Sequence, residues 1–449
     1  MREMKDSGVV SIGMIPVEWK TIKLKFLFGD GNEGLKIGPF GSAMKGKTLE
    51  SGEYKIYNQA HLINNDFSLN RHFVSEETFQ ELRNYEVKPG EVLFSMMGTI
   101  GKCRIMPEGY PKGIMDSHLL KAGLNLNIVH PQYFVYAYDK DYSSQVIEQL
   151  LYSSNGTIMN GLNSTILKNV KIAMPYSLGM QRKIVNYLDT KCSKIDEIIE
   201  KQQAIIEKLK EYKVSIITEV VTKGLDYEVD YKESGTEWLG KIPSHWQYLS
   251  FKNVLKERNE KNFPVKTAER LSLSIDKGVT LYSEKTTNLD RFKDDVSQYK
   301  LAHEGDFVLN SMNMIVGAVG ISHYFGCVSP AYYTYYDNEE DHITAKYCDY
   351  LFHSKTVKKV LHSLGKGIMS IDRGNDRINT CRLKVSRTDL RALKIPVPPI
   401  CEQREIVKYL QSKENLIDKT IADRNKAIDK LQEYKKSLIY EVVTGKKEV

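Results

Sequence analysis

Cysteine is scarce in this chain. Its 449 residues include six cysteines, and no two of them form a Cys-x-x-Cys pair. This scarcity disfavours a disulfide-stabilised secreted scaffold, and the missing pair disfavours a structural zinc site of the usual spacing. We therefore expect reduced thiols in a cytoplasmic protein.

Long apolar runs are also missing. Residues 307–336 lack Asp, Glu, Lys and Arg, but they include Asn310, Asn313 and Pro330, which is typical of buried strands and not of a membrane helix. The first ten residues carry Arg2, Glu3, Lys5 and Asp6, so no signal peptide is expected.

The composition is that of an ordinary globular chain. It is 41% hydrophobic and 27% charged, which is ample for hydrophobic cores and excludes general disorder. At roughly 100–200 residues per domain, two to four units are expected. The net charge of +7 permits a polyanionic partner but does not establish one.

The chain repeats itself. Residues 181–222 align without a gap on residues 403–444, and 22 of the 42 positions are identical. Residues 7–19 align on residues 234–246, and both segments end in Ile-Pro-x-x-Trp. Each half therefore consists of this entry motif, a variable segment and a repeated C-terminal helix, as expected for an internal duplication.

Both repeated segments have the apolar period of a coiled coil, with steps of three and four residues. At 1.5 Å per residue each would make a rod of roughly 60 Å, and we predict that the two pair antiparallel as a spacer. Two polar residues on the apolar stripe, Gln202 and Arg424, would fix the register. The predicted seam comprises Leu188, Ile195, Ile199, Gln202, Ile206, Leu209, Ile216, Leu410, Ile417, Ile421, Arg424, Ile428, Leu431 and Leu438.

The variable segments, 20–175 and 247–395, are rich in short alternating runs separated by turn residues. We predict strands within 91–100, 306–316 and 331–336, and helices at 131–151 and 343–364. The predicted fold class is α/β (α+β): two domains with curved sheets, joined by two long helices in a pseudo-twofold repeat. The predicted boundaries are 1–176, 177–224, 225–397 (with a linker at 225–241) and 398–449.

One segment matches a nucleotide-binding pattern. Residues 41–48 fit G-x-x-x-x-G-K-[ST], but a P-loop needs a buried strand before it and a helix after it. Here Gly and Pro interrupt the preceding stretch, and Gly52 follows closely. A glycine-rich loop bearing Lys36, Ser42, Lys45 and Lys47 fits contact with a nucleic-acid backbone better.

Other catalytic signatures are absent from the sequence. It contains no Gly-x-Ser-x-Gly, no His-Glu-x-x-His and no (Asp/Asn)-Pro-Pro-aromatic tetrapeptide. We predict no catalytic residue, no metal site and no cofactor in this chain.

Several motifs together resemble one known family, the specificity subunits of type I restriction–modification systems. The shared motifs are the two Ile-Pro-x-x-Trp entries, the Gly38–Ser42 loop, the turns Gly90-Glu91 and Gly305-Asp306 with glycines after them, Ser329–Tyr332, and the proline-rich lead into Gln403. The usual lead is P-L-P-P-x-x-E-Q. The first copy departs from it before Gln181, where it lacks one Pro and the Glu.

The resemblance implies that each variable segment is a target-recognition domain that reads half of a gapped, asymmetric site in double-stranded DNA. It implies that the helices set the gap and dock two adenine methyltransferase subunits. S-adenosylmethionine would bind to those partners, and ATP and Mg to restriction subunits, which the resemblance also implies as partners. The chain itself would then be non-catalytic.

Side chains that can pair with base edges are the candidate DNA contacts. In the first domain they are Asn58, Gln59, His61, Arg71, Thr99, Lys102, Asn155, Thr157, Asn160 and Asn163. In the second domain they are Lys277, Asn310, Ser311, Asn313, Lys366, Arg373, Asn375 and Arg377.

Two alternatives stay open from the sequence. The chain could be a structural coiled-coil adaptor with two protein-binding domains, which would show no salt-dependent DNA binding. It could also be an enzyme, for instance a nucleotide hydrolase that uses residues 41–48.

Overall fold

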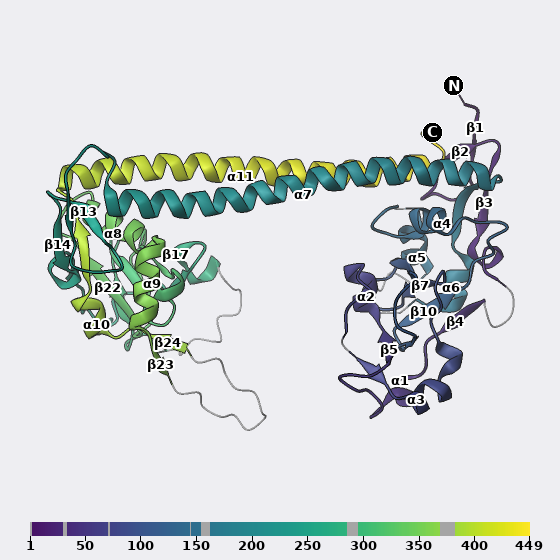
Figure 1. Ribbon diagram of the computed structural model, residues 1–449, viewed down its shortest axis with the longest axis horizontal. Coiled ribbons are helices and arrows are strands. Elements are labelled where there is room, and N and C mark those ends of the chain that lie inside the picture. The colour runs from purple at the N-terminus through teal and green to yellow at the C-terminus, as the bar shows by residue number, and fades with distance from the viewer. Residues whose placement is uncertain are drawn as a thin grey trace. The chain divides into compact units, whose positions relative to one another are not determined.

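The computed structural model describes residues 2–29, 34–70, 72–143, 145–153, 162–284, 295–368 and 382–449. The chain divides into two compact units (Figure 1). Unit 1 comprises Met1–Gln202 and Asn425–Val449, and unit 2 comprises Gln203–Arg424. The two long helices, α7 (Leu178–Lys223) and α11 (Ile400–Val443), therefore each contribute to both units.

Unit 1 contains a four-stranded antiparallel sheet of order β4-β10-β7-β8. A smaller sheet, β6-β5-β9, contains the parallel pair β5 and β9. The elements of unit 1 that precede α7 are β1 (Met4–Asp6), β2 (Met14–Pro16), β3 (Trp19–Lys23), η1 (Leu24–Phe26), β4 (Leu35–Ile37), α1 (Gly41–Met44), β5 (Tyr54–Tyr57), α2 (Gln59–Asn64), β6 (Phe73–Val74), α3 (Glu76–Glu81), η3 (Arg83–Tyr85), β7 (Val92–Ser95), β8 (Cys103–Ile105), β9 (Gly113–Met115), β10 (Leu119–Ala122), α4 (Pro131–Tyr138), α5 (Ile147–Ser153), α6 (Ser164–Asn169) and β11 (Lys171–Pro175).

Unit 2 contains a four-stranded antiparallel sheet of order β15-β22-β19-β20. Its elements between α7 and α11 are β12 (Tyr231–Glu233), β13 (Lys241–Pro243), β14 (Gln247–Ser250), η4 (Phe251–Asn253), β15 (Lys256–Glu257), β16 (Leu271–Ser274), β17 (Gly278–Leu281), η5 (Tyr282–Glu284), β18 (Lys300–Ala302), β19 (Phe307–Asn310), η7 (Met314–Val316), β20 (Val319–Ile321), β21 (Gly326–Val328), β22 (Tyr332–Tyr336), α8 (Ile343–His353), α9 (Lys355–Leu364), β23 (Lys366–Ile368), β24 (Arg382–Lys384), α10 (Arg387–Ala392) and β25 (Lys394–Val397).

Each four-stranded sheet packs against a helix through buried aromatic side chains. In unit 1, Phe94 of β7 meets Tyr138 of α4 edge to face, with ring centroids 5.0 Å apart. In unit 2, Phe307 of β19 meets Phe352 of α8 in the same way at 5.3 Å. These four rings are buried, so the hydrophobic core of each unit lies between its sheet and this helix.

The predicted strands and helices exist but are shorter than the sequence pattern indicated. Strand β7 ends at Ser95 and β19 at Asn310, because the glycine-containing stretches after them form loops. The predicted helix 343–364 is two helices, since Ser354 is extended and its hydroxyl accepts the amide of Val357 to begin α9. The predicted helix 131–151 likewise separates into α4 and α5.

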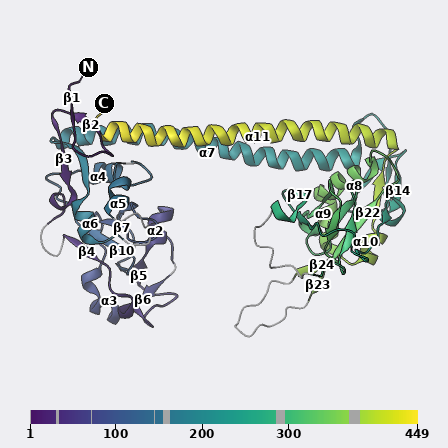
Figure 2. The ribbon, with the colours of Figure 1, turned by 180° about the vertical axis from the view of Figure 1, so that it is seen from behind.

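The two long helices run antiparallel within each unit (Figures 1 and 2). In unit 1, Lys435 of α11 pairs with Asp196 of α7 at 2.6 Å. In unit 2, Lys213 of α7 pairs with Asp418 of α11 at 3.0 Å. Asp196 and Lys213 of α7 align with Asp418 and Lys435 of α11 at the repeat shift of 222 residues. The aligned residues of the two helices therefore form equivalent ion pairs in the two units.

The seam predicted from the sequence lies on these paired helices. Most of its aliphatic members are buried, and Leu209, Ile421 and Leu431 are half-buried. The polar residues Gln202 and Arg424 are half-buried. In α7 unit 1 ends at Gln202, and in α11 unit 2 ends at Arg424. Their role in fixing the register stays a prediction.

In each unit, a buried tyrosine forms a hydrogen bond with the C-terminal end of one long helix. The hydroxyl of Tyr133 donates to the main-chain oxygens of Ala173 and of Val443, near the end of α11. The hydroxyl of Tyr347 donates to the main-chain oxygens of Pro396 and of Val221, near the end of α7. Helix ends leave carbonyl groups without partners inside the helix, and these tyrosines satisfy one in each unit.

The Ile-Pro-x-x-Trp motifs pack against the same helix ends. A Cβ at Gly445, just after α11, would lie 2.5 Å from Pro16 and 3.3 Å from Trp19. A Cβ at Gly224, just after α7, would lie 3.3 Å from Trp246. Both glycines have positive φ, which suits a left-handed residue after a helix. The repeated motif is therefore a docking contact for the repeated helix.

The predicted fold class is confirmed: the chain has two domains of mixed helix and sheet with open sheets, and two long helices. No helix in the described ranges is both long enough and apolar enough to cross a membrane.

Candidate nucleic-acid interface

The N-terminus of α2 carries three of the predicted DNA contacts in unit 1. The Asn58 side chain accepts the amide of Ala60 and caps the helix, while His61 Nδ1 lies 3.1 Å from the Asn58 amide. His61 is buried, and burial lowers the pKa of its imidazole, so the ring is neutral near pH 7. Asn58 and Gln59 are only half-buried and keep polar atoms near the surface.

The loop between β7 and β8 lies beside this helix. Gln59 Nε2 donates to the main-chain oxygen of Met97 at 2.9 Å. The Thr99 hydroxyl bonds to Ser95 Oγ at 2.6 Å. Lys102 Nζ forms an ion pair with Asp141 at 2.8 Å and donates to the main-chain oxygen of Ile63 in α2, at 3.2 Å. The structure thus brings Asn58, Gln59, His61, Thr99 and Lys102 together around one loop and one helix start.

The glycine-rich loop lies at α1, which has only four residues. Ser42 and Lys45 are exposed. Lys47 Nζ pairs with Glu81 at 2.6 Å, and Lys36 Nζ lies 5.0 Å from the centre of the Tyr85 ring. Because α1 ends before Gly46, the pattern at residues 41–48 does not place its Gly-Lys at a helix N-terminus as a P-loop requires.

The last predicted contact of unit 1 that can be placed is Asn163. Its side chain accepts the amide of Ile166 and caps α6. Four other predicted contacts, Arg71, Asn155, Thr157 and Asn160, lie outside the described residues.

In unit 2, three predicted contacts lie at the end of β19 and in the loop that follows it. The Asn310 side chain accepts the amide of Met312 at 3.0 Å, and Asn313 precedes η7. Ser311 is buried, and its main-chain oxygen accepts the amide of Val385. This loop corresponds to the β7–β8 loop of unit 1, because β7 and β19 hold the same place in their sheets.

The other predicted contacts of unit 2 are separate from this loop in sequence. Lys277 is exposed in the turn between β16 and β17. Lys366, in β23, pairs with Asp389 at 3.3 Å and is largely exposed. Arg373, Asn375 and Arg377 lie outside the described residues. The assignment of all these side chains to DNA contact stays a prediction.

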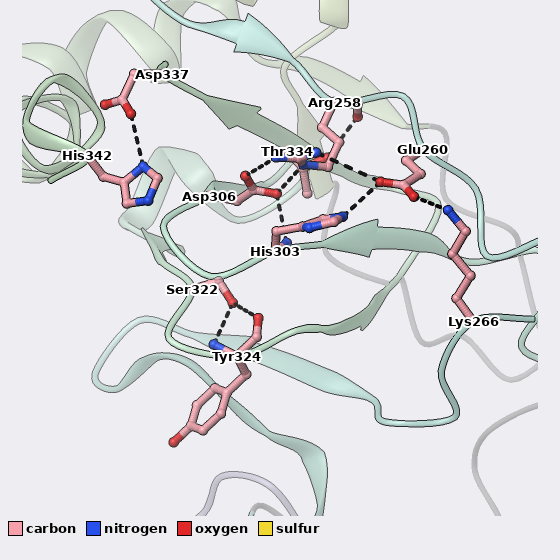
Figure 3. A network of polar contacts seen from close by, with 10 residues as sticks. All are labelled: Arg258, Glu260, Lys266, His303, Asp306, Ser322, Tyr324, Thr334, Asp337 and His342. Atoms are coloured by element: carbon pink, nitrogen blue, oxygen red, sulfur yellow. Dashed lines mark hydrogen bonds and ion pairs between the residues drawn. The ribbon is translucent and has the colours of Figure 1, made fainter. Parts of the chain in front are cut away.

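A buried acidic residue directly precedes the strand that leads into each loop. In unit 2, Asp306 accepts the amide of His303 and two hydrogen bonds from Arg258, at 2.6 and 2.9 Å (Figure 3). Figure 3 also shows Glu260 bound to His303 and Lys266. This network fixes the start of β19.

Unit 1 uses the same arrangement with other residues. Glu91 accepts the amide of Lys88 at 2.7 Å and pairs with Lys121 of β10 at 2.8 Å. The two acidic residues are those of the Gly-Glu and Gly-Asp motifs found in the sequence. Their role is thus to anchor the strand, and a charged side chain provides the counter-ion in each unit.

Sequence reasoning missed the two tyrosines that hold the helix ends and the counter-ions Arg258 and Lys121. The helix–helix pairs Lys435–Asp196 and Lys213–Asp418 lie inside the aligned repeat and could have been found there. Among the described residues, no group of three or more His, Cys, Asp and Glu side chains could hold a metal ion.

The paired long helices, the tyrosine contacts at their ends and the Ile-Pro-x-x-Trp motifs occur in both units, and we call them the repeated frame. A comparison with protein families identifies the family of the chain that carries it. The family model described as the type I restriction modification DNA specificity domain matches the chain twice, over residues 16–211 and 243–430. The chain belongs to this family. The predicted function is confirmed at this level: the chain is a specificity subunit of a type I restriction–modification system, with two DNA-specificity domains.

Two relatives from one organism agree with this assignment. The chain is 25% identical over 450 residues to the putative type I restriction enzyme MjaX specificity subunit of Methanocaldococcus jannaschii, covering 97% of this chain and 95% of the relative. It is 24% identical over 352 residues to the MjaVIII specificity subunit of the same organism, covering 75% and 74%.

Two solved structures share the fold. One is a chain from work on complex assembly and conformational transition of the type I R-M system, with a TM-score of 0.65 and 13% identity, covering 96% of this chain and 98% of that one. The other is the HsdS subunit of Thermoanaerobacter tengcongensis, with a TM-score of 0.52 and 15% identity and the same coverage.

Proposed function

We propose that each domain of this specificity subunit reads one half of a gapped, asymmetric site in double-stranded DNA. The observation that carries this proposal is the contrast between frame and loops. The two domains share a strand order, a tyrosine contact and an entry motif, but their β7–β8 and β19–β20 loops differ in sequence. Different side chains on one frame suit two different base sequences.

The long helices supply the spacer in this proposal. Half-sites must lie on compatible faces of the duplex, so the helices that connect two readers would also set the gap between half-sites. The repeated ion pairs and helix ends offer the same surface twice, which suits two copies of one partner. We assign these surfaces to two adenine methyltransferase subunits, to which restriction subunits would add.

The chemistry would belong to those partners. S-adenosylmethionine would be bound by the methyltransferase subunits, and ATP and Mg by the restriction subunits. The chain itself would supply recognition and no catalytic group. We place the complex in the cytoplasm, where its DNA substrate lies.

Long-read methylation sequencing tests this function. A host free of DNA methylation would express the chain with the methyltransferase encoded beside it, and a control host the methyltransferase alone. We expect one bipartite adenine-methylation motif that requires this chain. A methyltransferase that binds the chain yet leaves no motif would refute the proposal and favour an adaptor without DNA recognition.

A further inference from the structure

A groove in unit 2 is lined by several cationic side chains. It has a volume of about 440 Å³ and lies between the long helices, α8, α9 and the β16–β17 hairpin. Figures 1 and 2 both show α9 beside β17. The groove is lined by four lysines, Lys213, Lys277, Lys346 and Lys358, and by three acidic residues, Asp276, Asp349 and Glu414.

Lys358 of α9 is the central feature of this groove. Its side chain is half-buried, and within the described ranges its Nζ has no hydrogen bond or ion pair. Burial lowers the pKa of the Lys358 ammonium, and no acidic group offsets this effect. A half-buried amine without an anion is costly, so an anion that enters the groove would stabilise its charge.

Close backbone contacts place Lys358 and the hairpin in the same groove. A Cβ at Gly317 would lie 2.9 Å from Lys358 Nζ, so the amine rests on the backbone at the end of the β19–β20 loop. A Cβ at Gly320 would lie 3.1 Å from the Cα of Gly278. This glycine contact brings the β16–β17 turn, with Lys277, onto β20.

Two of the three acidic residues in the groove already have partners. Glu414 pairs with Lys213 at 3.2 Å and accepts the Tyr350 hydroxyl at 2.9 Å. Asp349 faces His353 of α8 at 3.4 Å. Burial works against the imidazolium of His353, but Asp349 outweighs it and raises the pKa of His353. The remaining acid, Asp276, is exposed and precedes Lys277.

The corresponding groove of unit 1 has the opposite charge. It is lined by Asp189, Asp196, Glu197 and Glu200, with Lys435 as its only lysine among the lining residues. Tyr136 lines this groove and Tyr350 the groove of unit 2, each three residues after the tyrosine that holds a helix end. Lys213 matches Lys435 in the repeat, whereas Lys277, Lys346 and Lys358 lie in the variable segment of unit 2 and do not come from the repeated frame.

We propose that Lys358, in the groove that Lys277 also lines, binds a phosphate group of the DNA backbone. This inference rests on the proposed function, because it requires that the domain contacts DNA. The groove adjoins the β19–β20 loop, so a phosphate held there would set the position of unit 2 on its half-site. The acidic groove of unit 1 would make no such contact, and the two domains would hold the backbone differently.

Two neighbouring variants test the proposal. Lys358→Ala and Lys359→Ala each remove one positive charge from α9, but Lys359 is exposed and does not line the groove. Each full-length variant would be assembled with its methyltransferase partner, and the affinity for the DNA site would be measured between 50 and 300 mM salt. The loss of one phosphate contact makes the slope of log K against log salt less negative by about 0.9. We expect this loss for Lys358→Ala and little change for Lys359→Ala.

Equal slopes for the two variants would overturn the proposal, because charge alone would then explain the effect. Protection of Lys358 from amine acetylation gives a second measurement. Protection by the DNA site supports the proposal, whereas protection by inorganic phosphate and not by DNA would overturn the DNA contact. A wild-type complex that binds no DNA at any salt would instead refute the proposed function.

Discussion

The two units share a frame and differ in what the frame carries. In both, a tyrosine hydroxyl holds the end of a long helix, a lysine–aspartate pair joins the helices, and an Ile-Pro-x-x-Trp motif packs after the helix. The counter-ion of the buried acidic residue is Lys121 in unit 1 and Arg258 in unit 2, and the groove beside the long helices is acidic in unit 1 and cationic in unit 2. Contacts within the frame are thus kept where they hold the helices, and residues away from them have diverged.

The largest predicted effect concerns the two buried tryptophans. Trp246→Ala and Trp19→Ala should each lower the free energy of unfolding of its unit by about 3–5 kcal/mol. Trp246 should cost more, because its indole N–H donates to Glu402 at 3.0 Å, whereas the position matching Glu402 in the other repeat is Met180. Hydrogen exchange resolved by unit measures both values. A larger loss for Trp19→Ala would contradict the comparison.

The next effect separates buried from exposed ion pairs. Lys121→Met leaves Glu91 buried without its counter-ion and should cost about 3–5 kcal/mol. Lys47→Met removes an exposed partner of Glu81 and should cost about 0–1 kcal/mol. Urea unfolding of unit 1, followed by hydrogen exchange, compares the two variants. Similar costs would mean that the Glu91 pair does not anchor the strand.

Two histidines should give the units opposite responses to pH. Burial lowers the pKa of His61 below the ordinary 6.5. The stability that unit 1 gains from a neutral His61 is therefore present above pH 6.5 and is lost as the pH falls from 6.5 through the lower folded value. Asp349 raises the pKa of His353 despite burial, so its contribution to unit 2 is present below 6.5 and is lost as the pH rises through the higher folded value.

Hydrogen exchange at pH 5.5 and 7.5 measures this difference. His61→Gln should remove the pH response of unit 1 and leave that of unit 2, and His353→Gln should do the reverse. A response of the same sign in both units would show that other groups dominate.

The smallest effect concerns the pairs between the helices. Lys435→Met and Lys213→Met should each cost about 0–1 kcal/mol, because both pairs are partly exposed. Lys213 should cost slightly more, since it also contacts Glu414. Thermal unfolding with unit-resolved exchange measures the two values. A loss of several kcal/mol at either position would contradict the account of these pairs.

The sequence predicted the frame better than the interface. The alignment of 181–222 on 403–444 was enough to predict two long helices, and it contains both ion pairs between them. Tyr133 and Tyr347 were missed because they lie in the variable segments, where their spacing of 214 residues differs from the 222 of the helices. An ungapped comparison cannot match positions whose connecting loops differ in length.

Residues around the loops were harder to predict for another reason. His61 and Asn310 have the side chains expected of base readers, and the sequence gives no sign that they also form local hydrogen bonds. Lys358 was not a candidate at all, because its partial burial without a partner appears only once α9 packs beside η7. The burial of a side chain and its ion pairs depend on contacts between residues distant in the sequence, and one amino-acid sequence alone does not reveal these contacts.

The central claim is that two different readers occupy one repeated frame, and one chimera tests it directly. Residues 20–173 would replace residues 247–396, so that the first variable segment fills both positions between Trp19 or Trp246 and the matching strands β11 and β25. Methylation sequencing of a host that expresses this chimera with its methyltransferase should show two identical half-sites in inverted order. A motif that stays asymmetric, from a chimera shown to assemble, would contradict the claim that each domain reads its own half-site.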